Sequence, residues 1–265
     1  SKRVALALNI KGMMNLQLAV KDEQVWMIEV NPRASRTVPF ISKATGIPLA
    51  KIGTQIMLGK TLKELGLTME YRAIDHYAIK ESVFPFLKLP GVDSILTPEM
   101  KSTGEVMGID EDLDIACYKA EIASGTNLPM EGGVYVTVND GDKPKVLNCV
   151  RDLYEMGFNI YATKGTSTFL RKNGIQTTTV FTLSEKYKPQ ATEYMRSGMI
   201  NMIINTPSNK SGAIRDGYQL RRLAVELEMP FLTTANGAKM AVAAIKVLRG
   251  KDLTVKSMRE YHTFQ

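Results

Sequence analysis

A carboxylate and two carboxamides near the start of the chain have the spacing of a divalent-cation site. Gln17 lies in one short apolar run, and Glu29 and Asn31 lie in the next, beyond the polar turn 21–24. Two such runs around a turn predict a β-hairpin, and residues two apart on a strand share one face. Oxygen ligands of this kind suit Mg²⁺, which usually shares its coordination with substrate phosphates. The spacing alone favours a surface hairpin with a solvated glutamate and an ordinary Asn-Pro turn over a cation site.

Two arginines follow the second predicted strand. Pro32 ends that strand, and Arg33 and Arg36 come directly after it. A guanidinium is a forked donor that matches the oxygens of a carboxylate or a phosphate. The arginines therefore extend the predicted cation site toward an anionic ligand.

A second group of polar residues lies behind the predicted strands in the other half of the chain. Hydroxyls, an ammonium group and the N–H groups of a helix start can bind phosphate. Each residue also has a structural explanation as a helix cap, a solvated lysine or part of a flexible loop. Their joint position at strand ends keeps an anion site open beside these explanations. The group consists of Thr137, Lys143, the segment 163–166 and the loop 205–212.

The pattern of apolar residues divides the chain near 125–133, a segment rich in glycine and interrupted by proline. Before this linker we expect, besides the hairpin, the end of a helix at 3–9, helices at 40–45, 49–58 and 112–124, and a strand at 78–86.

Beyond the linker, strands alternate with helices, which predicts a parallel sheet with helices on both faces. Ligands in such folds bind beyond the carboxyl ends of the strands. The expected strands are 134–138, 159–162, 178–181, 199–204 and 230–233. The expected helices are one that ends at 156 and those at 167–173, 190–197, 218–228 and 237–248.

Composition agrees with a globular protein in the cytoplasm. The 265 residues are 44% hydrophobic and 23% charged, enough for two modest cores. No apolar run approaches the roughly 18 residues that a membrane helix needs, so we expect no membrane partner. The net charge of +7 comes from lysines and arginines scattered among acids, so we expect no nucleic-acid partner. Cys117 and Cys149 have no metal-site spacing, and we expect reduced, packed thiols.

The segment 28–46 resembles the closing part of an ATP-grasp domain in the large chain of carbamoyl-phosphate synthetase. The likeness continues through 79–81 and 98–108 to the end of the chain, and it resembles the C-terminal end of the large chain, where a regulatory domain follows the second ATP-grasp domain. It implies an α/β protein. Residues 1–125 would form the C-terminal part of an ATP-grasp domain (α+β). Residues 126–265 would form a doubly wound, mainly parallel, five-stranded Rossmann-like domain of the methylglyoxal-synthase-like kind.

The resemblance implies that Gln17, Glu29 and Asn31 bind Mg²⁺ or Mn²⁺ with the phosphates of ATP. It also implies that Arg33 stabilises the phosphoryl group in transfer or the carbamate. Phosphoryl transfer needs mainly positioning and neutralisation of charge. The family is a ligase that takes ammonia from glutamine and phosphorylates carbamate with a second ATP. Its partners would be a glutaminase small subunit and the remainder of the large chain.

Other parts of the family's ATP site precede Ser1, so the piece alone is not expected to turn over ATP. A shortened polypeptide, a proteolytic remnant and one part of a split subunit all fit the sequence.

In the second half, the family's effector-phosphate positions fall on Thr137, Lys143, Thr163, Thr166 and Asn205. The resemblance thus implies a nucleotide effector of the UMP or IMP type. A family lysine is replaced near Thr182, and Pro207 stands where a hydroxyl is usual, so the identity of the effector stays open.

Glu81 and Thr233 match family positions that contact ornithine, although Leu232 stands where some members carry an aspartate. The sequence does not choose between arginine and pyrimidine synthesis. Assembly as a homo-oligomer also stays open.

The sequence allows two other functions. Methylglyoxal synthase uses an aspartate in a Gly-Gly-Asp motif after the fourth strand as general base; this chain has 208–212 there, and its nearest acid is Asp216. A binding domain is therefore favoured over a lyase. The other alternative is a stand-alone nucleotide-sensing module without catalysis.

Overall fold

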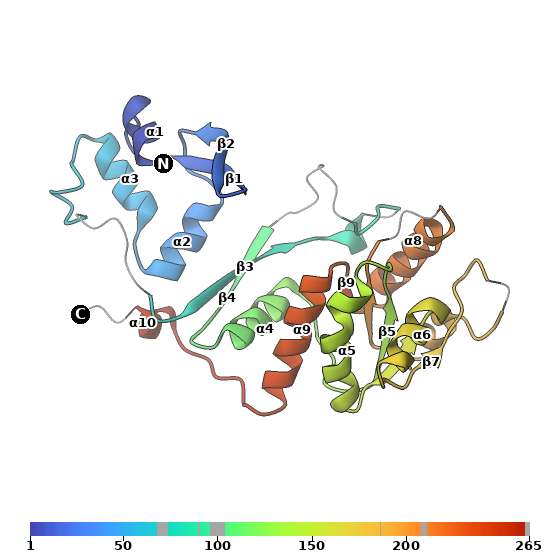
Figure 1. The fold of residues 1–265 in the computed structure, drawn as a ribbon. Coiled ribbons are helices and arrows are strands. Elements are labelled where there is room, and N and C mark those ends of the chain that lie inside the picture. The colour runs from blue at the N-terminus through green and yellow to red at the C-terminus, as the bar shows by residue number, and fades with distance from the viewer. Residues whose placement is uncertain (68–73, 90, 96–103, 186, 208–210, 263–265) are drawn as a thin grey trace. The chain divides into compact units, whose positions relative to one another are not determined.

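The computed structural model describes residues 1–67, 74–89, 91–95, 104–185, 187–207 and 211–262, with the side chains of 211–213 left out. The chain divides into two compact units, Ser1–His76 with Val255–Gln265 and Tyr77–Thr254. Figure 1 shows the elements of each unit.

The first unit contains the predicted hairpin. Its strands β1 (Asn15–Lys21) and β2 (Gln24–Asn31) pair antiparallel. Asp22 and Glu23 form the turn with positive φ angles of 50° and 61°, the conformation that two-residue hairpin turns favour. The remaining elements are the helices α1 (Lys2–Ala7), α2 (Thr37–Thr45), α3 (Leu49–Met57) and α10 (Met258–Tyr261).

The core of the first unit is small. Ala44 is its buried apolar residue among the described positions, and His76 is buried beside it, with Nε2 2.7 Å from the carbonyl oxygen of Ala44. On the hairpin, Trp26 is 60% exposed. The hairpin therefore keeps its shape through its own ladder and turn rather than through burial.

The second unit opens with an antiparallel pair covered by a helix. Strand β3 (Tyr77–Val83) pairs with β4 (Gly104–Asp110), and α4 (Leu113–Ser124) packs on both. The sequence pattern did not predict β4. The strand expected at 78–86 ends earlier, because the chain leaves β3 before Pro85, which precedes the short helix η1 (Phe86–Lys88).

The same unit holds a five-stranded parallel sheet, which confirms the predicted doubly wound fold. The strand order is β7-β6-β5-β8-β9. The strands are β5 (Gly133–Thr137), β6 (Asn159–Ala162), β7 (Thr178–Thr179), β8 (Met202–Asn205) and β9 (Phe231–Leu232). The helices are α5 (Lys143–Glu155), α6 (Lys164–Lys172), α7 (Ala191–Arg196), α8 (Ser211–Glu226) and α9 (Ala235–Leu248).

Alternation along the strands builds a core on each face of the sheet. Val134 and Val136 of β5 pack with residues of α5, α6 and α9. Tyr135, between them, packs on the opposite face with residues of α7 and α8. Figure 1 shows α4, α9 and α5 side by side, and α9 contacts both neighbours. Two covered faces are what a parallel sheet requires.

Two helices begin earlier than the apolar pattern indicates. Helix α6 starts at Lys164 rather than at residue 167, because Thr163 is already the extended residue before the helix. Helix α8 starts at Ser211 rather than at residue 218, so the expected loop is shorter; its residues 208–210 lie outside the described part. The resemblance at 98–103 also falls on residues that are not described.

The predicted linker 125–133 lies inside the second compact unit. Leu128, within this segment, is 5% exposed and belongs to the core of the sheet. The assignment of 1–125 and 126–265 to two functional domains stays a prediction.

The cysteines are packed thiols, as expected. Cys117 and Cys149 are both buried and unbridged. Burial raises the pKa of the Cys117 thiol and raises that of Cys149 to about 11. Both are therefore poor nucleophiles at neutral pH.

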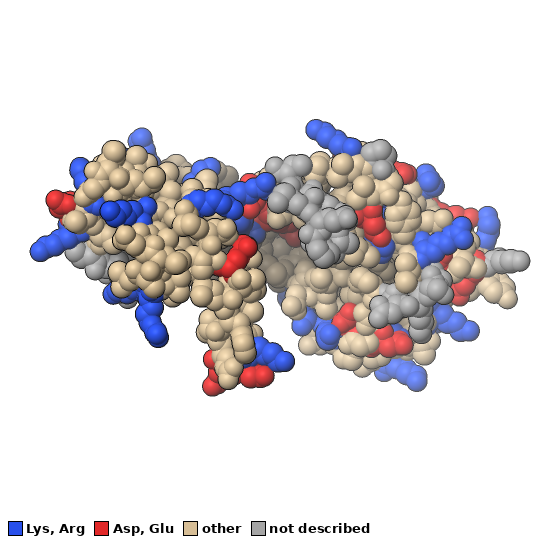
Figure 2. All heavy atoms as spheres, turned by 90° about the horizontal axis from the view of Figure 1, so that it is seen from above, with Lys and Arg blue, Asp and Glu red and all other residues tan. Residues whose placement is uncertain are grey.

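On the face seen in Figure 2, basic and acidic side chains are interspersed without a continuous basic stripe. Among the described residues, no helix has the length and apolar character to cross a membrane.

Candidate functional site

The hairpin brings the three predicted metal ligands together. Gln17 on β1 lies directly opposite Glu29 on β2, and an irregularity in the ladder follows Gln17. Asn31 donates from Nδ2 to Glu29 Oε1 at 2.9 Å. This bond uses the amide nitrogen of Asn31, so its oxygen still serves as an acceptor. The predicted shared face is therefore present.

The chemistry of these groups fits a hard divalent cation. One carboxylate and two carboxamides supply oxygen ligands, and a single formal charge suits Mg²⁺ or Mn²⁺ that shares phosphate oxygens. Among the described residues, no group of three or more His, Cys, Asp or Glu side chains could hold a metal ion. Arg33 follows on an exposed turn, where Nη1 donates to the carbonyl oxygen of Ala34 at 3.0 Å.

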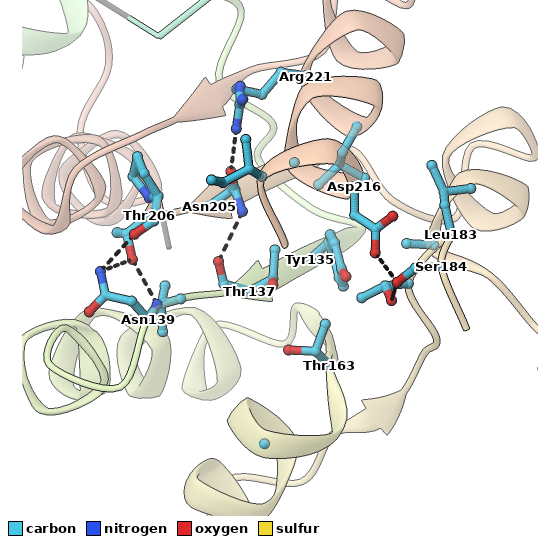
Figure 3. A pocket seen from close by; sticks show the side chains of 18 of the residues that line it. Tyr135, Thr137, Asn139, Thr163, Leu183, Ser184, Asn205, Thr206, Asp216 and Arg221 are labelled. Carbon is cyan, nitrogen blue, oxygen red and sulfur yellow. Dashed lines mark hydrogen bonds between the residues drawn. The ribbon is translucent and has the colours of Figure 1, made fainter. Parts of the chain in front are cut away.

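A cavity of about 590 Å³ lies at the carboxyl ends of the parallel strands (Figure 3). Thr137 from β5, Thr163 after β6 and Asn205 from β8 line it together. Three of the five predicted anion-binding residues thus share one cavity, at the edge where parallel α/β sheets bind ligands.

The other two predicted residues do not line this cavity. Thr166 is 2% exposed, and its Oγ1 accepts from Thr163 Oγ1 at 3.3 Å. Lys143 donates from Nζ to Asp140 Oδ1 at 2.7 Å. A Cβ on Gly165, which lines the cavity, would lie 3.5 Å from this Nζ, so the ammonium group is close to the start of α6.

Sequence reasoning missed several residues of the cavity wall. Asn139 donates from its backbone N–H to Thr206 Oγ1 at 3.0 Å, which ties the loop after β5 to the loop after β8. On α8, Arg221 is 3% exposed and bonds both Asn205 and Asp93. A buried arginine among the polar positions of α8 leaves no signal in the sequence, because its partner Asp93 is 128 positions away.

Four acids also line the cavity: Asp93, Asp140, Glu185 and Asp216. Asp216 accepts a hydrogen bond from Ser184 Oγ (Figure 3). Glu185 Oε2 accepts from the backbone N–H of Thr182 at 2.8 Å. Since Thr137 and Thr163 line the same cavity, it can present donors to an anion and acceptors to hydroxyl or amino groups.

The floor of the cavity includes Tyr135, which is 2% exposed. Burial raises the pKa of its phenol, so the group stays protonated at neutral pH.

The predicted ornithine-contacting residues lie elsewhere in the second unit. Glu81 on β3 accepts from Ser124 Oγ at 3.4 Å. It does not pair with its neighbour Lys80, which bonds Glu105 across the ladder at 2.9 Å. Burial raises the pKa of the Glu81 carboxyl, and the Ser124 hydrogen bond opposes the shift. Thr233 follows directly after β9, where it is half-buried.

The parallel sheet with its cavity defines an α/β domain of the MGS-like class. The family model described as "MGS-like domain" matches residues 145–233. A second model, "Carbamoyl-phosphate synthase L chain, ATP binding domain", matches residues 1–65. The crystal structure of methylglyoxal synthase from Elizabethkingia anophelis NUHP1 is similar over 43% of this chain and 79% of the synthase chain. The sequence identity is 16% and the TM-score is 0.35.

Relatives identify the family more closely. The carbamoyl phosphate synthase large chain of Archaeoglobus fulgidus is 50% identical over 263 residues, which are 99% of this chain and 24% of the relative. The "Carbamoyl phosphate synthase large chain, C-terminal section" of Methanocaldococcus jannaschii is 48% identical over 267 residues, which are 97% of this chain and 43% of the relative. The chain therefore belongs to the carbamoyl phosphate synthase large chain family and corresponds to its C-terminal section. It spans less than half the length of these relatives.

Proposed function

We propose that this chain is the part of a glutamine-dependent carbamoyl phosphate synthase that completes the carbamate-phosphorylating site and binds a regulatory ligand. The family assignment and the match to an ATP-binding domain support the ligase function. The cavity that Thr137, Thr163 and Asn205 line together is the observation that carries the regulatory part.

At the first site, Gln17, Glu29 and Asn31 would hold Mg²⁺ or Mn²⁺ with the phosphates of ATP. When bound there, the divalent ion would neutralise part of the negative charge of the ATP phosphates. Asn31 orients the carboxylate of Glu29 through its hydrogen bond at 2.9 Å. Arg33, on the exposed turn after β2, would contact the oxygens of the phosphoryl group in transfer.

At the second site, the hydroxyls of Thr137 and Thr163 and the amide of Asn205 would bind the phosphate of a nucleotide such as UMP or IMP. Lys143 and Thr166 would contribute without lining the cavity. Lys143 would attract the phosphate by its charge, and Thr166 would orient the hydroxyl of Thr163 by accepting its hydrogen bond. The acids of the cavity wall, Asp216 among them, would accept from hydroxyl groups of the ligand.

Calorimetry of the 265-residue chain with UMP, IMP, ornithine and N-acetylglutamate tests the regulatory part. We expect one nucleotide to bind with a stoichiometry of one. Asn205→Ala should weaken that binding. Asn201→Ala is the control and should leave the binding unchanged, because Asn201 lies outside the cavity wall and bonds the backbone of Gly133. Absence of nucleotide binding would refute the effector assignment.

Ornithine would bind near Glu81 and Thr233 rather than in the cavity. The half-buried carboxylate of Glu81 can accept from an amino group. Loss of an ornithine signal in Glu81→Gln, with nucleotide binding retained, would support two separate effector sites.

The partners in this proposal are a glutaminase small subunit and the remainder of the large chain, in the cytoplasm, in a synthase that serves arginine or pyrimidine synthesis. A stand-alone nucleotide-sensing module is the alternative. Gel filtration with the rest of the large chain separates the two: co-elution and restored synthase activity support the synthase, and their absence supports the module.

One observation favours a second chemistry. Asp216 lies on the cavity wall although it lacks the Gly-Gly-Asp context of methylglyoxal synthase, and a carboxylate there can serve as a general base. Release of phosphate from dihydroxyacetone phosphate, abolished by Asp216→Asn, would reveal such a lyase. We expect none, because the hydrogen bond from Ser184 engages this carboxylate.

A further inference from the structure

Arg221 is a buried cation in the wall of the cavity, and Asp93 holds it. Its Nε and Nη2 donate to the two carboxylate oxygens of Asp93, each at 2.6 Å. Two parallel bonds of this kind fix both the position and the plane of a guanidinium. A cation that is 3% exposed needs such a partner, because an unpaired buried charge is costly.

The remaining side of Arg221 faces Asn205. Nη1 donates to Asn205 Oδ1 at 3.3 Å, and Asn205 Nδ2 donates to the carbonyl oxygen of Thr137 at 3.2 Å (Figure 3). A guanidinium has only donors and a backbone carbonyl only accepts. The carboxamide can therefore satisfy both neighbours in one orientation, with its oxygen toward Arg221 and its N–H₂ group toward the end of β5.

This orientation matters for an anionic ligand. An oxyanion beside Thr137 requires donors, and the reversed carboxamide would present its oxygen there and repel the ligand. We propose that Asp93 and Arg221 are positioning residues of the anion site, which act by keeping the N–H₂ group of Asn205 on the ligand side. The proposal rests on the effector function of the cavity proposed above.

Asp93 comes from outside the segment that the MGS-like family model matches, 145–233. It lies on the connection between β3 and β4, and it lines the cavity itself. Burial works to raise the pKa of its carboxyl, but hydrogen bonds from Arg221 and from the N–H of Ile95 outweigh burial and hold the pKa below its usual range. The carboxylate is therefore ionised at neutral pH, as its bidentate role requires.

Arg222 offers a matched control on the same helix. Its Nη1 donates to the carbonyl oxygens of Phe86, Leu89 and Val92 at 3.5, 3.4 and 3.5 Å. Arg222 thus holds the same connection as Arg221 does, but through backbone oxygens, and among the described residues it makes no hydrogen bond to Asn205. A change at Arg222 loosens the connection and leaves the carboxamide in place.

The test measures binding of UMP and of inorganic phosphate to the 265-residue chain by calorimetry, at pH 7 and constant salt. The variants are Asp93→Asn, Asn205→Ala, the double variant and Arg222→Gln. We expect Asp93→Asn to weaken binding of both probes about tenfold, the effect of one hydrogen bond to a charged group. In the Asn205→Ala background, Asp93→Asn should weaken binding of the probes less than about twofold. The effects of two substitutions are not additive when one residue acts through the other. Arg222→Gln should also cost less than about twofold.

Equal losses from Asp93→Asn in both backgrounds would overturn the proposal, since they would mean a general structural effect. An equal loss in Arg222→Gln would overturn it for the same reason. If Asp93→Asn does not fold, Arg221→Lys replaces it: lysine keeps the charge next to Asp93 but cannot reach both partners as a fork, so it should show the same loss and the same dependence on Asn205. Failure of the unmodified chain to bind either probe would refute the effector function and this proposal with it, whereas normal binding with additive losses refutes this proposal alone.

Discussion

Gln17 lies directly opposite Glu29 in the β1–β2 ladder, and Asn31 hydrogen-bonds the same carboxylate from the next position on that face. All three proposed ligands therefore depend on one register of the hairpin. A shift by one residue would turn Glu29 and Asn31 to the other face. The turn at Asp22 and Glu23 sets the pairing from Lys21 to Leu18, and the irregularity between Gln17 and Leu18 then brings Glu29, rather than Ile28, opposite Gln17.

The first prediction concerns metal binding at this hairpin. Glu29→Gln removes the one formal charge of the proposed ligand set and should weaken Mn²⁺ binding at least about tenfold, because cation affinity depends on the number of charged ligands. Electron paramagnetic resonance of free Mn²⁺ measures this. Glu23→Gln removes a carboxylate from the turn and should leave the affinity unchanged. Equal weakening in both variants would mean that Mn²⁺ responds only to net charge.

The second prediction concerns Lys143. Lys143→Ala should weaken nucleotide binding by about 1.5 to 3 kcal/mol if the ammonium group contacts the phosphate. Calorimetry with UMP measures the difference. Since Lys143 is held by Asp140 at 2.7 Å and does not line the cavity, we expect a loss near the lower end of that range. An unchanged affinity would remove Lys143 from the site.

The third prediction concerns Asp140, the carboxylate that bonds Lys143. Asp140→Asn removes the carboxylate that holds Nζ, and the ammonium group can then turn toward the start of α6. We expect tighter binding of UMP, about threefold, because a competing anion has been removed. Asp142→Asn changes a carboxylate on the same turn that bonds Lys145 and Asn139 rather than Lys143, and it should change the affinity less. Tighter binding in both variants to the same extent would point to net charge.

The fourth prediction tests the contact between β4 and α4. A Cβ on Gly108 would lie 1.9 Å from the carbonyl oxygen of Ala116 and 2.5 Å from the N–H nitrogen of Ala120. Gly108→Ala should therefore lower the free energy of unfolding by about 1 to 3 kcal/mol or more, as overpacking does. Gly104→Ala, on the same strand with open space around the new Cβ, is the control in urea denaturation. Equal stability of the two variants would contradict the close packing.

The fifth prediction concerns pH. Burial, and then the charge of Glu81, raise the pKa of Glu121 on α4 from 4.5 to about 7. The folded chain thus binds the proton more tightly than the unfolded chain. The stability that the protonated Glu121 carboxyl contributes to the folded chain is fully present below about pH 4.5. It is lost as the pH rises through about 7, because the buried carboxylate then ionises.

Glu121→Gln removes this ionisation and should raise the free energy of unfolding at pH 8 by about 1 to 3 kcal/mol. Near pH 4.5 the variant and the unmodified chain should differ little. Denaturation at both pH values measures the difference, with exposed Glu131→Gln as the control. A gain that is equal at both pH values would show that the raised pKa is not its cause.

Much of the architecture follows from local sequence. The hairpin is specified by apolar runs around 21–24, and the strand at 159–162 matches β6 in both of its bounds. Such elements depend on periodicity and turn residues, which neighbours along the chain determine. The positions of Thr137, Thr163 and Asn205 at strand ends were predicted for the same reason, and parallel pairing brings them to one edge.

Tertiary structure decided which side chains reach the cavity. Thr166 turns into the protein and Lys143 turns to Asp140, although both follow strands as the others do. The link from Asp93 through Arg221 to Asn205 joins residues 128 and 16 positions apart. The periodicity of the sequence does not predict these long-range hydrogen bonds. They form because folding removes the charge of Arg221 from water and brings Asp93 next to it.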